Sequence, residues 1–206
     1  LKGAGSWTHQ YADPANTSCS ADDLVKGPLG VLWYRDSDFE MPSRHGRGPA
    51  PLLYEGVLIV EGMNGLRAVD AYNGRPLWEF CIPGVLKPYH AEHLVGTAAT
   101  GSNFCVSASG VYVRAGGKCY RLETATGRKL AEFDAPPKPD GKPGTWGHLA
   151  VEGGTVYGSV ADDRHVVKHA YGKSDMSQLF SESLRFFALD AETGSRKWTY
   201  EAKHSI

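Results

Sequence analysis

The sequence predicts an all-β fold made of repeated four-stranded antiparallel units, and three observations lead to this prediction. Short stretches of alternating apolar and polar residues recur along the chain, as in strands with one buried face. An Asn-Gly or Thr-Gly pair follows one such stretch in each copy, and its glycine (Gly74, Gly127 or Gly194) supplies the positive φ of a tight turn. The copies lie about 50 to 65 residues apart, a spacing typical of β-propellers and related arrays.

Each copy contains three clear strands and a shorter one before them. The clear strands are expected at 56–60, 66–70 and 76–80 in the first copy, at 110–113, 119–123 and 129–133 in the second, and at 154–157, 186–190 and 196–200 in the third. A further apolar stretch precedes each copy, at 49–53, 103–106 and 148–151. Four strands per copy is the strand count of a propeller blade.

An acidic residue closes the third strand of every copy, four residues before the turn glycine. These residues are Asp70, Glu123 and Asp190. A carboxylate at this place can accept hydrogen bonds from turn N–H groups, so we interpret the three acids as turn formers rather than catalytic groups.

The chain is expected to be the N-terminal part, 1–206, of a single propeller domain. We divide it into an entry segment at 1–34, blades at 49–80 and 103–133, and a third blade at 147–200 that carries an insert at 162–184. Residues 31–34 are expected to form a lone closing strand. Because a closed ring takes typically about 4 to 8 blades, three blades leave it incomplete, and we expect the remaining blades in the full-length chain.

The repeat pattern resembles that of the PQQ-binding-like β-propellers, which include quinoprotein alcohol dehydrogenases and the outer-membrane assembly factor BamB. The stretches 70–78 and 190–198 share Asp, Ala, Gly and Trp at the same offsets, with the indoles at Trp78 and Trp198. The middle copy departs from the pattern, with Glu123 for Asp and Ala131 for Trp. The opening from Trp7 to Trp33 looks like the usual N-terminal entry of these propellers. The resemblance implies a bacterial protein of the periplasm or another extracytoplasmic space.

Composition excludes some partner classes. The chain has 22 basic and 23 acidic side chains and a formal net charge of −1, which implies no attraction to nucleic acid. No apolar run approaches the roughly 18 residues that a membrane span requires. The four cysteines show neither a C-x-x-C spacing nor a haem-attachment motif, and Cys105 and Cys119 are expected to be small buried residues.

The long irregular segments are predicted to lie on one face of the propeller. They span 35–48, 81–102, 134–147 and 162–184, whereas the turns on the opposite face are minimal. Long loops on a rigid scaffold are the usual place for binding and catalytic groups. The candidate residues for a ligand- or partner-binding face are Arg44, His45, Arg47, His90, His93, Trp146, His148, Asp163, Arg164, His165 and His169.

Two pairs within this set suggest specific chemistry. His90 and His93 have a spacing that can chelate a divalent metal, but no third ligand is identifiable, so we predict no metal site. Arg44 and Arg47 can form a fork for a carboxylate or phosphate, or can pair with acidic residues nearby in the sequence.

We favour a non-catalytic scaffold that binds a protein, peptide or glycan through the long-loop face, with no cofactor. The alternative is a quinoprotein-type dehydrogenase that uses PQQ and calcium to oxidise alcohols or sugars. Members of that class resembling this repeat carry an adjacent Cys-Cys disulfide, calcium ligands and a catalytic Asp. Here the corresponding segment holds only the separated Cys81 and Cys105.

Overall fold

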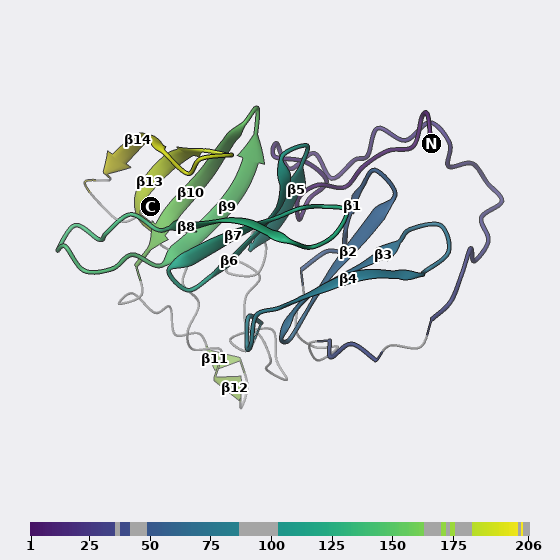
Figure 1. Cartoon of the computed structure of the whole chain (residues 1–206), viewed down its shortest axis with the longest axis horizontal. Helices are drawn as coiled ribbons and strands as arrows, with labels where there is room; N and C mark the ends of the chain where they lie inside the picture. The colour runs from purple at the N-terminus through teal and green to yellow at the C-terminus, as the bar shows by residue number, and fades with distance from the viewer. Residues whose placement is uncertain are drawn as a thin grey trace.

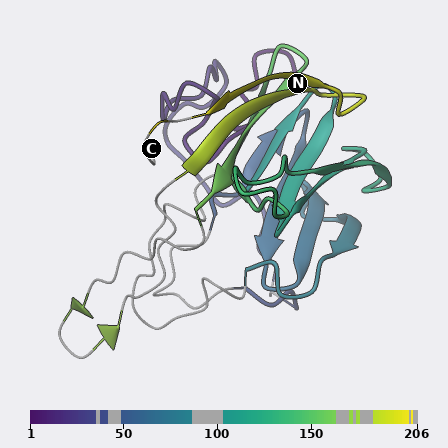
Figure 2. The ribbon, with the colours of Figure 1, turned by 90° about the vertical axis from the view of Figure 1, so that its left-hand side faces the viewer.

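The computed structural model describes residues 1–35, 38–41, 49–86, 103–162, 170–171, 174–175, 183–201 and 203. Over these residues the fold is all-β, as the sequence predicts, and it contains three four-stranded antiparallel sheets. Each sheet is one propeller blade. Figure 1 shows the three sheets following one another in chain order, and Figure 2 shows the same succession from the side.

The first two blades are simple up-and-down sheets. Blade 1 consists of β1 (Leu52–Tyr54), β2 (Val57–Gly62), β3 (Gly65–Asp70) and β4 (Pro76–Cys81). Blade 2 consists of β5 (Phe104–Ser107), β6 (Gly110–Ala115), β7 (Lys118–Leu122) and β8 (Lys129–Asp134). Each strand pairs with the next along the chain.

Blade 3 contains the long insert that the sequence predicts between its second and third strands. Its strands are β9 (Trp146–Glu152), β10 (Thr155–Ala161), β13 (Ser183–Asp190) and β14 (Arg196–Glu201). The insert contains a small ladder between β11 (Ala170–Tyr171) and β12 (Ser174–Asp175).

Apolar side chains fill the two interfaces between the blades. Ile59 and Leu66 of blade 1 pack with Phe104 and Val111 of blade 2 in one buried cluster. A second cluster joins blade 2 to blade 3 and includes the nearly perpendicular ring pair Trp146 and Phe187, whose centroids lie 4.8 Å apart. Burial of this alternating apolar face is what holds successive sheets together.

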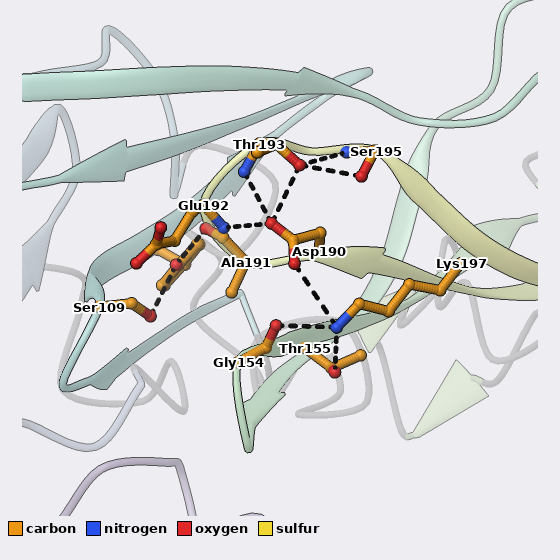
Figure 3. Close-up of polar contacts among 10 residues, drawn as sticks. Ser109, Gly154, Thr155, Asp190, Ala191, Glu192, Thr193, Ser195 and Lys197 are labelled. Atoms are coloured by element: carbon orange, nitrogen blue, oxygen red, sulfur yellow. Dashed lines mark hydrogen bonds and ion pairs between the residues drawn. The ribbon is translucent and has the colours of Figure 1, made fainter.

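The turn between the third and fourth strands has the same geometry in all three blades. The N–H of the turn glycine donates to the carbonyl of the preceding acid, at 2.9 Å for Gly74, 2.8 Å for Gly127 and 2.9 Å for Gly194. Each of these glycines has a positive φ, near +70°. In blade 3, Oδ1 of Asp190 also accepts from the Glu192 and Thr193 N–H groups and from the Thr193 hydroxyl (Figure 3). The carboxylate therefore fixes the turn, as a turn former does.

An aromatic ring of the preceding blade lies directly on the turn glycine of the next blade. A Cβ added at Gly127 would come within 2.6 Å of the Trp78 indole, so only glycine fits there. The same indole donates from Nε1 to the Thr124 carbonyl at 2.8 Å. Trp78 thus joins blade 1 to blade 2 through a ring contact and a hydrogen bond.

The middle blade fills the equivalent position in a different way. Ala131 occupies the register position of Trp78, opposite Arg121, but Phe133 two residues further along β8 lies on Gly194. Because phenylalanine has no N–H, the hydroxyl of Tyr112 donates to the Ala191 carbonyl instead, at 2.6 Å. A large neighbouring side chain therefore compensates for Ala131.

Trp198 and Trp78 occupy equivalent positions, because Trp198 lies opposite Ala188 just as Trp78 lies opposite Ala68. Trp198 is nevertheless 46% exposed and contacts Tyr157 of its own blade. No further blade follows it among the described residues, so interblade packing is seen for Trp78 and not for Trp198.

Residues 31–35 form no strand in the structure, although a closing strand was predicted at 31–34. Trp33 nevertheless lies on Gly74 and donates from Nε1 to the Ala71 carbonyl at 2.8 Å, as Trp78 does one blade later. Trp33 thus contacts blade 1 as the last strand of a preceding blade would. Pairing of this segment with a further blade stays a prediction.

The N-terminal segment crosses the innermost strands of all three blades. Trp7 exchanges two backbone hydrogen bonds of 2.8 Å with Leu53 of β1, and the Thr8 carbonyl accepts from the Val106 N–H of β5 at 3.0 Å. His9 Nε2 accepts from the Val151 N–H of β9 at 3.1 Å. Each blade therefore gains a partner for backbone groups at its inner edge, where no strand continues the sheet.

We predict that Phe133→Ala lowers the free energy of unfolding by about 3 kcal/mol or more, because the change empties the space above Gly194. The matched control is Leu130→Ala on the same strand, where the side chain is 37% exposed and the expected cost is below about 1 kcal/mol. Urea unfolding of the full chain measures both values. Equal costs for the two variants would contradict a docking role for Phe133.

Candidate functional site

The long connections between the blades and the insert of blade 3 leave the sheets at the same end, which we call the long-connection face. Its described parts are 38–41, 81–86 and 134–147 in the connections, and 161–162 and 183–185 at the two ends of the insert. The opposite end, the short-turn face, carries the turns at 54–57, 107–110 and 152–155 together with the three glycine turns.

In blade 1 two segments fold back onto the turn between β2 and β3. The side chain of Asn64 in this turn binds both segments, because Nδ2 donates to Glu40 at 2.8 Å and Oδ1 accepts from the Gly84 N–H at 2.9 Å. Arg67 pairs with Asp38 and with Glu79, and it stacks over the Phe39 ring at 4.7 Å. These contacts fix 38–41 and 82–86 against the strand ends.

In blade 2 the connection 134–147 is fixed in a similar way. The Ala135 N–H donates to the Gly117 carbonyl at 2.8 Å, and the Trp146 N–H donates to the Gly116 carbonyl at 2.9 Å. Arg185 of blade 3 donates to the Pro137 carbonyl at 2.5 Å and pairs with Glu201. The connection is therefore bound at both ends and by the next blade.

Most of the candidate residues lie outside the described residues. These are Arg44, His45, Arg47, His90, His93, Asp163, Arg164, His165 and His169. The predictions that concern the His90 and His93 pair and the arginine fork therefore stay predictions.

The structure places the other two candidates on β9, in different environments. Trp146 is 1% exposed and belongs to the core between blades 2 and 3, so its ring is not part of the surface of the face. His148 is exposed, but protein atoms around its ring and the positive charge of Arg114 lower its pKa below the ordinary value. Of the two described candidates, His148 is therefore the one whose side chain reaches the surface.

A buried polar cluster between the blades escaped the sequence analysis. Glu61 of β2 is 2% exposed, and Nδ2 of the equally buried Asn103 lies 2.6 and 2.5 Å from its two carboxyl oxygens. Burial raises the pKa of Glu61 to about 8, against the opposing effects of Asn103 and the Arg114 charge. At neutral pH the carboxyl group is therefore mostly protonated.

Arg114 links this cluster to the third blade. Its backbone N–H donates to the Asn103 carbonyl at 2.8 Å, and its Nη1 donates to the Trp146 carbonyl at 3.2 Å. Glu61 and Arg114 occupy the same register position in consecutive blades, the fourth residue after Val57 and Gly110. The sequence signal for this cluster was a charged residue in each of two otherwise apolar strands, Glu61 in β2 and Arg114 in β6, on the strand face that packs into the core.

Features expected of a quinoprotein dehydrogenase site can be compared with the described residues alone. Within the described part of the chain no group of three or more His, Cys, Asp or Glu side chains can hold a metal ion. Cys81 is exposed and Cys105 is buried, and both are free thiols.

No helix within the described residues has the length and apolar character needed to cross a membrane.

Glu61→Gln tests the raised pKa through the pH dependence of stability. Because the folded state holds a proton on Glu61 that the unfolded state releases above about pH 4.5, the free energy of unfolding falls as pH rises from about 4.5 to about 8. The glutamine side chain cannot titrate, so the variant should lose this pH dependence. Near pH 8.5 its free energy of unfolding, relative to that of the wild type, should be higher than at pH 5 by up to about a few kcal/mol. Urea unfolding at pH 5 and pH 8.5 measures the difference.

The control for this experiment is Glu79→Gln, which removes an exposed carboxylate paired with Arg67. It should keep the wild-type slope between the two pH values. Identical pH dependence in the wild type and Glu61→Gln would show that Glu61 is ionised in the fold.

Comparison with known proteins agrees with the repeat architecture. The family model described as "Outer membrane protein assembly factor BamB" matches residues 63–206. No curated protein matches the chain.

Two of the solved structures with a similar fold are dehydrogenases. A europium-containing methanol dehydrogenase has a TM-score of 0.60 and 17% identity, over 97% of this chain and 32% of its own. The quinohemoprotein alcohol dehydrogenase of Comamonas testosteroni has a TM-score of 0.61 and 21% identity, over 96% of this chain and 27% of its own.

BamB from Moraxella catarrhalis aligns over 71% of this chain and 33% of its own, with a TM-score of 0.40 and 20% identity. The chain spans about a third or less of the length of the two dehydrogenases, and at such identities the likeness to them shows the fold alone. The family model, however, covers more than half of the chain, and the chain belongs to the family of PQQ-like β-propellers that this model describes under the name of BamB.

Proposed function

We propose that this chain forms part of a non-catalytic propeller scaffold that binds a protein, peptide or glycan through the long-connection face. The proposal extends to the location, the periplasm or another extracytoplasmic space, which rests on family membership. The partner and the remaining blades are not part of the described structure.

The observation that supports this proposal is the way the long connections are held. Segments 38–41, 82–86 and 134–147 pack back onto the strand-connecting turns through backbone and side-chain hydrogen bonds. A surface of this kind is preorganised, which lowers the entropy that a partner must overcome on binding. The opposite face carries only minimal turns.

The side chains that this face presents suit recognition rather than chemistry. Met41 is 42% exposed, and the ion pair between Lys142 and Asp140 lies largely in solvent at 3.3 Å. The buried Glu61 and Asn103 lie between the blades, where they bind each other.

Site-specific photo-crosslinking of the full-length protein in its native cells tests which face binds. A photoreactive residue at Met41 or Lys142 should give discrete adducts. The matched control is Tyr72, which is 43% exposed and lies on the Gly74 turn of the opposite face. Adducts from Tyr72 with none from Met41 and Lys142 would contradict the proposal, and protease or glycosidase treatment of the adducts identifies the class of partner.

A different measurement distinguishes the scaffold from a PQQ-dependent dehydrogenase. Titration of the full-length protein with PQQ and calcium should leave tryptophan fluorescence unchanged and yield no dye-linked alcohol oxidation. Saturable quenching together with alcohol oxidation would replace the scaffold function with a catalytic one.

A further inference from the structure

A cavity of about 470 Å³ opens on the short-turn face, away from the proposed binding face. Its walls come from all three blades and from the N-terminal segment, with Tyr54, Ser107 and Glu152 in blades 1, 2 and 3, and with His9 at the crossing of the inner strands. This volume lies within the range of roughly 300 to 1,000 Å³ typical of small-molecule sites. All of its lining residues are among the described residues.

Three polar groups that line the cavity make no hydrogen bond or ion pair with any described residue. They are the carboxylates of Glu152 and Glu192 and the hydroxyl of Tyr54. Figure 3 shows the Glu192 carboxylate pointing away from the Asp190 turn, whose contacts use only the Glu192 backbone. The cavity therefore offers two strong acceptors and one donor beside an aromatic ring.

The charges around the cavity exclude an anionic ligand. No lysine or arginine lines it, and burial, with a smaller effect from His148, lowers the pKa of His9 to about 4, so the imidazole is neutral at pH 7. Two carboxylates in the wall repel phosphate and carboxylate groups.

Two cations just behind the wall weaken the attraction for a cationic ligand. Arg121 donates to the Ser109 and Glu192 carbonyls, at 2.8 and 3.2 Å, and Lys197 donates to the Gly154 carbonyl at 3.1 Å. The charge of Arg121 offsets part of the negative charge of the two carboxylates, whereas Lys197 also pairs with Asp190 at 3.7 Å. Two carboxylate acceptors beside an aromatic ring suit a ligand that is rich in hydroxyl donors and able to lie against that ring.

We propose that this cavity binds a neutral saccharide unit, whose hydroxyl groups donate to Glu152 and Glu192 and whose apolar ring face packs against Tyr54. Tyrosine suits such a role because its ring is apolar and its hydroxyl end is polar. The site is independent of the proposed function, since it lies at the opposite end of the sheets.

Calorimetric titration of the full-length protein with cellobiose, maltose and N,N′-diacetylchitobiose tests the proposal. At least one of these sugars should bind saturably, and Glu152→Gln with Glu192→Gln in one variant should weaken that sugar about tenfold or more. Tyr54→Leu should also weaken it, whereas Tyr54→Phe should retain most of the affinity. The control is Asp23→Asn, an exposed carboxylate outside the cavity, which should bind as the wild type does.

Three outcomes would overturn the proposal. They are the absence of binding by all three sugars, undiminished binding by the double variant, and saturable binding of putrescine, a simple diamine, in place of sugar. Circular dichroism of each variant shows that a loss of binding is not a loss of fold. Since none of these substitutions lies on the long-connection face, crosslinking from Met41 and Lys142 should be unaffected by them.

Discussion

The contact between an aromatic ring and a turn glycine is the constraint on which the blade arrangement depends. Trp33, Trp78 and Phe133 each lie where a Cβ on Gly74, Gly127 or Gly194 would come within 2.7 Å of the ring. The positive φ of that glycine serves the turn, and its missing side chain leaves room for the ring. One residue thus sets both the hairpin and the distance between successive sheets.

The interface between blades 2 and 3 shows which parts of this contact are interchangeable. Phe133 supplies the ring from two residues further along the strand, and Tyr112 supplies the hydrogen bond that phenylalanine cannot make. Ring and donor are separate requirements that Trp78 meets with a single side chain. In blade 3, Trp198 and Tyr157 are partly exposed, since the described residues contain no glycine turn of a following blade that could cover them.

Local periodicity was enough to predict the blades, because strand alternation and Gly turns are set within a few residues. The compensation for Ala131 was also foreseeable, since Phe133 stands on the same face of the strand. The crossing of the inner strands by residues 7–9 was not, because hydrogen bonds such as that from Val151 to His9 join residues 142 positions apart. The pairing of Glu61 with Asn103 and the short-turn cavity have the same origin, since the first needs blades 1 and 2 to pack and the second needs all three.

Replacement of a turn glycine by alanine tests the docking contact most directly. Gly127 and Gly153 both have positive φ, at +69° and +54°, but a Cβ on Gly127 meets the Trp78 indole whereas a Cβ on Gly153 meets nothing within 4 Å. Both alanine variants bear a similar backbone strain of about 1 kcal/mol, and Gly127→Ala should lose roughly a further 1 to 3 kcal/mol of unfolding free energy because the ring is displaced. Equal destabilisation of the two variants in urea unfolding would show that the ring contact does not hold the blades together.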